Sequence, residues 1–158
     1  MSYKPLQVAN YFLKEHGQNG KLTHLKLQKL VYFANGWRLG LNGGALVNER
    51  PQVWRYGPVF ASLYCALARF GQREIEAPVE AMAASSTIAP VDDLDVQKFL
   101  EKIWGEYGDY SGPELSDLSH ARGTPWRKVA EDYRFRVPYE TIIPEADDKA
   151  YFSKLAGN

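Results

Sequence analysis

The amino-acid sequence predicts a mainly α-helical fold: a single compact domain over residues 1–158, with about six to seven helices and one small β-hairpin. Three observations favour this fold class. Segments with the apolar period of amphipathic helices recur along the chain, whereas short β-prone runs gather between residues 45 and 56. A length of 158 residues is that of one domain. A content of 45% hydrophobic residues suits a globular core.

The strongest helical period lies between residues 22 and 43, and we expect it to form the central helix. Tyr32 and Phe33 widen its apolar face, so that one turn is apolar nearly all round. Thr23 can cap the start with its hydroxyl, and the glycines after Asn42 can end the helix. The apolar positions with helical spacing are Leu27, Leu30, Val31, Ala34, Trp37 and Leu41.

Shorter elements flank this helix. Residues 6–13 predict an amphipathic helix, with Pro5 suited to its first turn. After the central helix, residues 45–47 and 52–56 are β-prone runs separated by the turn-forming residues 48–51. The sequence therefore predicts a small hairpin from these two runs, and so short a hairpin must pack against the helices.

The chain then returns to helical patterns. A third helix is expected after the turn at residues 57–58 and before Gly71; its apolar face would comprise Val59, Phe60, Leu63, Tyr64 and Leu67. Residues 72–90 have no clean period and predict a surface loop. Asp92 or Asp93 can cap a fourth helix. The expected buried face of that helix comprises Val96, Phe99, Leu100, Ile103, Trp104 and Tyr107.

Capping signals mark the remaining helices. Ser111 and Glu114 match the spacing of a capping box, which starts a fifth helix. Thr124 as cap and Pro125 at the first helical position start a sixth. A terminal helix is expected over about residues 145–155. The predicted inner positions of these three helices are Leu115, Leu118, Trp126, Val129, Tyr151 and Leu155.

Composition limits the classes of function. Nineteen basic residues balance nineteen acidic ones, so no global field attracts nucleic acid or an anionic membrane. The single cysteine, Cys65, cannot form an internal disulfide, which favours a reducing compartment. No stretch has the apolar length of a membrane span, and the first residues do not lead into a signal-peptide core. We therefore expect a cytoplasmic protein.

The sequence offers little for catalysis. His16, His24 and His120 are scattered, and none has a second histidine or a cysteine at metal-ligand spacing. The glycines near residue 43 lack the Lys-Ser/Thr pair of a phosphate-binding loop. Cys65 is expected to be a small hydrophobic core residue, because free cysteines usually are. We predict no metal, no cofactor and no enzymatic activity.

Two motifs point to binding of a protein partner. In the strand that ends at residue 56, alternation should place Trp54 and Tyr56 on one face and Arg55 on the other. The second motif is the capped helix start that carries Trp126 and Arg127. Tryptophan, tyrosine and arginine are enriched in binding hot spots. The candidate partner-binding residues are therefore Trp54, Arg55, Tyr56, Trp126 and Arg127.

Structural roles compete with this interpretation. Each tryptophan could instead anchor a helix to the hairpin, and this is the expected role of Trp37 and Trp104, which lie inside apolar stripes. Arg55 could form an internal ion pair with a carboxylate of the fourth or fifth helix rather than face a partner.

Five motifs occur in a defined order, namely Leu25–Ala34, Trp37, Trp54–Val59, Leu115-Ser116 and Thr124–Trp126. In this combination they resemble the SocA-like antitoxin family, whose shared module is also called the Panacea domain and is found in prophage-associated proteins. The resemblance covers about residues 8–129, and the chain looks like the bare module without a DNA-binding extension.

The resemblance implies a protein that binds a toxin encoded next to it and neutralises it by direct complex formation. One kind of member acts instead as an adaptor that delivers its toxin to a cellular protease. The family implies no catalytic residues, and the cognate toxin is the implied partner.

DNA binding is a second hypothesis, as for antitoxins that regulate their own operon. Its support is local, because cations lie around the central helix and near Trp126. They are Lys21, Lys26, Lys29, Arg122, Arg127 and Lys128. Phosphate contacts of such residues would give salt-sensitive affinity. An enzyme with an unrecognised site is a third hypothesis.

Overall fold

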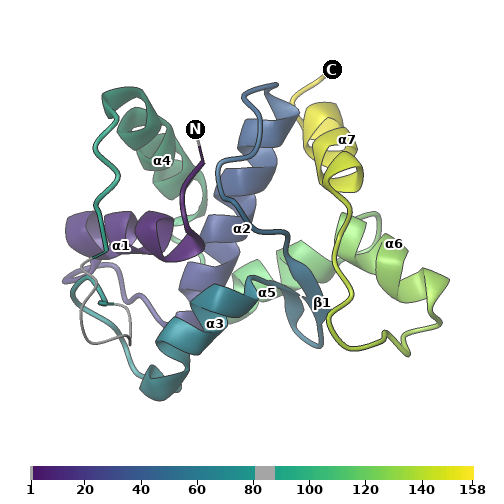
Figure 1. Ribbon diagram of the computed structural model, residues 1–158, viewed down its shortest axis with the longest axis horizontal. Coiled ribbons are helices and arrows are strands. Elements are labelled where there is room, and N and C mark those ends of the chain that lie inside the picture. The colour runs from purple at the N-terminus through teal and green to yellow at the C-terminus, as the bar shows by residue number, and fades with distance from the viewer. Residues whose placement is uncertain (1, 81–87) are drawn as a thin grey trace.

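The computed structural model describes residues 2–80 and 88–158 (Figure 1). Its elements are α1 (Pro5–His16), α2 (His24–Gly40), β1 (Gln52–Trp54), β2 (Gly57–Val59), α3 (Ala61–Leu67), the 3-10 helix η1 (Ala68–Phe70), α4 (Leu94–Tyr107), α5 (Gly112–His120), α6 (Pro125–Asp132) and α7 (Glu145–Leu155). Within the described residues, β1 and β2 form a two-stranded antiparallel sheet and seven α-helices make up most of the rest. The predicted fold class, mainly α with one small hairpin, is confirmed.

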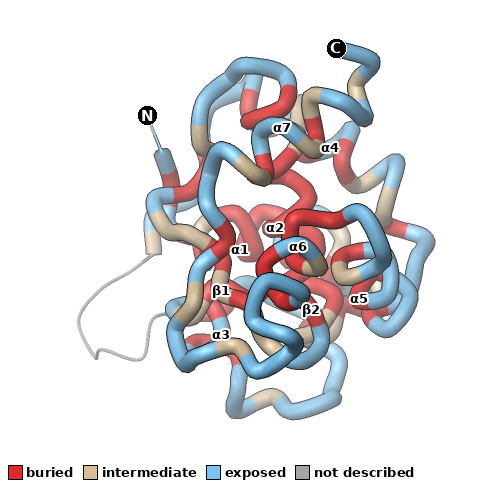
Figure 2. The backbone as a smooth tube through the Cα atoms, turned by 90° about the vertical axis from the view of Figure 1, so that its right-hand side faces the viewer, coloured by how far each residue is buried: buried red, intermediate tan, exposed pale blue. Residues whose placement is uncertain are grey.

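Helix α2 lies at the centre of the molecule, and α1, α3, α4, α5, α7 and β2 all contact it (Figures 1 and 2). Every residue from Lys26 to Gly36 is buried, as expected of a helix surrounded on all sides. The hydroxyl of Thr23 accepts a hydrogen bond from the Lys26 N–H at 3.3 Å, which confirms the predicted cap. Trp37 is partly buried, and its indole N–H donates to the Tyr107 hydroxyl at 2.7 Å.

The closest helix contact joins α2 to α7. Phe152 is fully buried against Gly36 and Gly40, two glycines one turn apart on α2. A Cβ on Gly36 would lie 2.1 Å from the Phe152 ring, so only glycine permits this approach. The predicted inner position Leu155 is wrong, because it is 52% exposed and Phe152 fills the contact instead.

The hairpin lies later in the chain than predicted: its strands are β1 and β2, whereas the predicted strands were residues 45–47 and 52–56. Val53 pairs with Pro58 and Trp54 with Gly57, so the turn consists of Arg55 and Tyr56. The predicted first strand, residues 45–47, does not pair with it. Val47 instead forms an isolated parallel bridge to Tyr3 near the start of the chain. The position of the hairpin was therefore wrong, although its existence is confirmed.

Because Val59 belongs to β2 and Phe60 is the N-cap, α3 begins later than predicted. Two residues of this helix do not face inward as predicted. Tyr64 is 41% exposed and Cys65 is also exposed, so the predictions of a buried Tyr64 and a core Cys65 were wrong. The confirmed core positions of this helix are Leu63 and Leu67.

The other helix starts agree with the sequence. Asp93 caps α4, Ser111 and Glu114 form the capping box of α5, and the Thr124 hydroxyl caps α6. Pro5 and the proline after Thr124 occupy the first positions of their helices, as predicted. Two further predicted inner positions lie near helix ends and are exposed: they are Leu41 and Leu118.

The predicted loop over residues 72–90 contributes to the core in its described part. Ile75 and Val79 are buried, and the Asn10 side chain exchanges hydrogen bonds of 2.7 and 2.8 Å with the backbone of Val79. A purely surface loop was therefore wrong for residues 72–80. Residues 81–87, for which a surface loop was also predicted, lie outside the described residues.

A buried ionic network ties α7 to the centre. Asp148 is fully buried on α7 and accepts hydrogen bonds of 2.6 Å from both the Tyr32 hydroxyl and the Arg50 guanidinium. Arg50 lies just before the hairpin and also donates to the carbonyl of Ile143 at 3.0 Å. The network therefore joins α2, α7 and the chain that leads into β1.

Candidate partner-binding surface

The hairpin is held on α2 by buried polar side chains. The Gln28 amide donates to the Phe60 carbonyl at 3.1 Å and accepts from the Phe60 N–H at 3.0 Å. The ammonium of Lys29, which is fully buried, donates to the Pro58 carbonyl at 2.8 Å. These contacts satisfy backbone groups that the two-stranded sheet leaves open.

Helices α5 and α6 hold the opposite side of the hairpin. The Ser116 hydroxyl donates to the Tyr56 carbonyl at 2.5 Å, and the Trp126 indole N–H donates to the Trp54 carbonyl at 2.8 Å. The backbone on both sides of Arg55 is therefore bound to the helical core.

Gly57 ends the turn with φ of +111°, a conformation that residues with a side chain rarely adopt. A Cβ at this position would lie 2.5 Å from the Ser119 hydroxyl and 3.2 Å from the Lys29 ammonium. Glycine is thus required both by the backbone angle and by the closeness of α2 and α5.

The turn itself faces solvent. Arg55 is exposed and Tyr56 is 60% exposed, and the guanidinium lies 5.4 Å from the centre of the Tyr56 ring. The predicted strand alternation was wrong here, because both residues belong to the turn and neither is anchored inward. The alternative of an internal ion pair for Arg55 was also wrong, because the side chain is exposed and no carboxylate among the described residues forms a salt bridge with it.

An aromatic cleft of about 350 Å³ lies beside the turn. The ring centres of Trp54 and Tyr64 are 4.8 Å apart, and those of His24 and Tyr64 are 5.0 Å apart. The Trp54 indole N–H donates to Gln52 at 2.8 Å, so its donor is satisfied within the chain. The residues that line this aromatic cleft are His24, Leu25, Gln28, Lys29, Trp54, Arg55, Tyr56, Val59, Tyr64 and Gly71.

The second predicted motif has a different geometry. Trp126 is 7% exposed, so its ring is a core anchor that is not available for direct contact with a partner. Arg127 is half-buried and donates two hydrogen bonds to the His120 carbonyl, at 3.1 and 2.8 Å. Its guanidinium also lies 5.4 Å from the ring of Phe135, which is 56% exposed. The structure therefore connects Trp126 to the hairpin and leaves Arg127 beside an exposed aromatic residue.

Two of the six cations that supported DNA binding are not on the surface. Lys29 is fully buried, and Lys26 is 5% exposed and donates to the Gly108 carbonyl at 2.5 Å. Neither ammonium can contact a phosphate in this structure. The basic patch predicted around the central helix is therefore wrong as far as these two residues are concerned, since only Lys21 of that group is exposed.

Burial lowers the pKa of Lys29 from 10.5 to about 7. In the unfolded chain this lysine binds a proton up to about pH 10, so between pH 7 and 10 unfolding takes up a proton and the stability due to Lys29 rises with pH. We expect Lys29→Met to remove this rise, which is at most about 1.4 kcal/mol per pH unit.

Chemical denaturation at pH 7, 8 and 9 checks this prediction. The difference in unfolding free energy between the wild type and Lys29→Met should change steadily with pH in favour of the wild type. A constant difference would mean that Lys29 is charged in the fold. Lys98→Met is the matched control, because Lys98 is exposed on α4.

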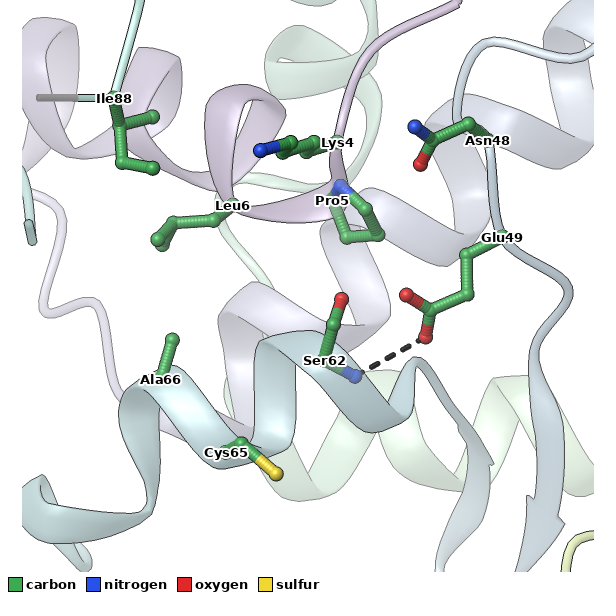
Figure 3. Close-up of a pocket in the computed structure, with 9 residues that line it drawn as sticks. All are labelled: Lys4, Pro5, Leu6, Asn48, Glu49, Ser62, Cys65, Ala66 and Ile88. Carbon is green, nitrogen blue, oxygen red and sulfur yellow. Dashed lines mark hydrogen bonds between the residues drawn. The ribbon is translucent and has the colours of Figure 1, made fainter. Parts of the chain in front are cut away.

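A second hollow lies on the other side of α3 (Figure 3). This groove of about 540 Å³ runs between α1 and α3, and Cys65 and Ile88 contribute to its lining. Glu49 accepts a hydrogen bond of 3.2 Å from the Ser62 N–H at the start of α3. Tyr64 and Cys65 therefore belong to different surfaces, one lining the aromatic cleft and the other this groove.

Comparison with known proteins agrees with the arrangement of these motifs. The family described as "Antitoxin SocA-like, Panacea domain" matches residues 27–127. The chain belongs to this SocA-like family. The Panacea segment begins in α2 and ends in α6, so it contains the whole hairpin and the side chains that hold it.

The chain is also similar to the Antitoxin SocA of Caulobacter vibrioides (strain NA1000 / CB15N). The two are 33% identical over 128 residues, which cover 78% of this chain and 68% of the relative. No solved structure matches the chain.

The described residues contain neither a membrane-spanning helix nor a cluster of metal-ligand side chains. None of their helices combines the length and the apolar character needed to cross a bilayer. Nor do three or more His, Cys, Asp or Glu side chains in that part of the chain gather as metal ligands would.

Proposed function

We propose that this protein is an antitoxin that neutralises a toxin encoded next to it by forming a direct complex. The proposal rests on its membership of the SocA-like family. The observation that supports the contact surface is the exposed turn of Arg55 and Tyr56 beside the aromatic cleft. The proposed role is non-catalytic, and the partner is a protein.

The surface has the features of a binding hot spot. Tyr56 and Tyr64 expose large aromatic rings next to the partly buried Trp54. Aromatic residues and arginine dominate hot spots because they bury much area with few rotatable bonds. Since Ser116 and Trp126 hold the backbone of the turn, little conformational entropy is lost when a partner binds.

The predicted partner-binding residues therefore divide into two groups. Trp54, Arg55 and Tyr56 are proposed to contact the toxin directly. Trp126 is proposed to act by positioning the hairpin, to which its indole N–H is bonded. Arg127 does not line the cleft; it lies beside the exposed Phe135 and is proposed as a separate contact.

Expression of the neighbouring gene tests the function. That gene alone should stop growth of the host, and co-expression of this protein should restore it. Failure to restore growth, with both proteins soluble, would contradict the proposal.

Tyr64→Ala tests the surface. We expect it to weaken binding of the purified toxin about tenfold or more, because it removes one wall of the aromatic cleft. The matched control is Tyr139→Ala, since Tyr139 is 90% exposed and does not line the cleft. Titration calorimetry measures both, and equal affinities of the two variants would exclude the cleft as the contact.

The level of the toxin separates the two modes that the family implies. If the protein neutralises by complex formation, the toxin persists in rescued cells and is recovered bound to this chain. If the protein instead delivers its toxin to a protease, the toxin disappears from rescued cells. Immunoblotting after co-expression distinguishes these outcomes.

A further inference from the structure

Apart from its tyrosines, the ionisable side chains that line the aromatic cleft are all basic. Of the ten residues that line it, none is Asp or Glu, and Arg55 is permanently charged. Burial lowers the pKa of both His24 and Lys29, so the positive charge of the cleft near neutral pH comes chiefly from Arg55. Cation-lined, partly desolvated clefts attract anionic groups, because field lines concentrate between low-dielectric walls. The overall neutrality of the chain makes this local excess of positive charge informative.

Arg55 is placed to bind an anion. Arg50, near the other end of β1, pairs with Asp148 inside the fold, whereas Arg55 forms no salt bridge with any carboxylate of the described residues. Its guanidinium lies 5.4 Å from the centre of the Tyr56 ring, and the residue is exposed to solvent. A guanidinium in this setting matches a carboxylate with two parallel hydrogen bonds.

Apolar surface lies directly beside this charge. The rings of Trp54 and Tyr64 are in contact and both line the cleft, and the indole N–H already has Gln52 as its acceptor. The faces of these two rings therefore offer apolar surface on which an apolar side chain can pack, since the indole donor is already used within the chain.

We infer that the aromatic cleft binds an acidic segment of the toxin, in which a carboxylate pairs with Arg55 while an adjacent apolar side chain packs on Trp54 and Tyr64. This inference rests on the proposed function and adds the chemistry of the partner. Electrostatic complementarity of this kind fixes orientation and selects among partners.

The first test measures affinity of the purified product of the neighbouring gene for charge variants of this protein. We expect Arg55→Gln to weaken binding about tenfold and Arg55→Glu about 100-fold, with melting temperatures close to the wild type, because Arg55 is exposed. Arg55→Lys should keep part of the affinity. The matched control is Lys98→Glu on α4, which makes the same change of charge at an exposed site outside the cleft and should change affinity less than about twofold.

A charge swap makes the test specific. Each Asp or Glu of the toxin is replaced in turn by Arg, and each variant is paired with wild type and with Arg55→Glu. At least one replacement should weaken binding to the wild type and restore binding to Arg55→Glu by about tenfold or more, because it re-forms the ion pair with reversed signs.

Three results would overturn the inference. If Arg55→Glu binds as the wild type does, or if no replacement in the toxin restores binding, then no toxin carboxylate pairs with Arg55. If a short single-stranded oligonucleotide competes with the toxin for the cleft, Arg55 binds nucleic acid rather than a toxin carboxylate. In all three cases loss of binding by Tyr64→Ala would leave the proposed function intact, whereas failure of the wild type to bind or rescue would contradict that function itself.

Discussion

Replacing Gly36 with valine is expected to lower the free energy of unfolding by about 3 kcal/mol. Even the first side-chain carbon would lie 2.1 Å from the ring of Phe152, which is fully buried. Overpacked cores lose about 1–3 kcal/mol, sometimes more, through displaced side chains and backbone. The small gain from replacing a helical glycine does not offset this loss.

Urea denaturation of two further variants tests whether the clash with Phe152 causes the loss of stability in Gly36→Val. Gly105→Val is the matched control, because Gly105 lies within α4 and a Cβ there would meet no atom within 4 Å. We expect its stability to be within about 0.5 kcal/mol of the wild type. The double variant Gly36→Val/Phe152→Ala should be less destabilised than the sum of its single changes, since the valine occupies the vacated space. Simple additivity would contradict the proposed clash.

Removing the carboxylate of Asp148 is expected to cost about 3–5 kcal/mol, the range for breaking a buried ion pair by truncating one partner. Asp148→Ala leaves the Tyr32 hydroxyl and the Arg50 guanidinium without their common acceptor. The buried hydroxyl and the largely buried cation then lose charge-assisted hydrogen bonds.

The preceding residue supplies the control for this prediction. Asp147 forms a 3.0 Å pair with Lys128, whose side chain is 64% exposed. Surface pairs contribute about 0–1 kcal/mol, so Asp147→Ala should be close to neutral. Thermal melts of the two variants should therefore differ widely. Similar melting temperatures would show that the Asp148 network does not stabilise the fold.

Helix existence and helix starts could be predicted because their signals are local. The apolar period of α2 and the hydroxyl of Thr23 act within a few residues of each other. The capping box of Ser111 and Glu114 is equally local. For α7 the local signal was incomplete. The inward pair is Asp148 and Phe152, and an aspartate is not counted as a core residue until its partners are known.

The hairpin was misplaced because its turn lacks the usual residues. Glycine and asparagine mark most two-residue turns, but here Arg55 and Tyr56 form the turn and the positive φ falls on Gly57. This shift also moved the start of α3 to Ala61. One error in the turn thus caused an error in the next helix.

The buried polar side chains that hold the hairpin on α2 could not be predicted from sequence. Lys29 and Gln28 interrupt an apolar stripe, and such residues usually form the solvent-exposed face of a helix. Their true partners are the Pro58 and Phe60 carbonyls, about 30 residues away along the chain. The aromatic cleft likewise requires α2, β1 and α3 to meet, which no local pattern shows.

The contact between α2 and α7 has a consequence for synthesis on the ribosome. Helix α2 ends at Gly40, whereas α7 begins at Glu145, so about 100 residues must be translated between them. At about 5–20 residues per second this takes roughly 5–20 s. Throughout that interval Phe152 has not been synthesised, so the surface of α2 at Gly36 and Gly40 is not covered by α7. The complete core can therefore form only when translation is almost finished.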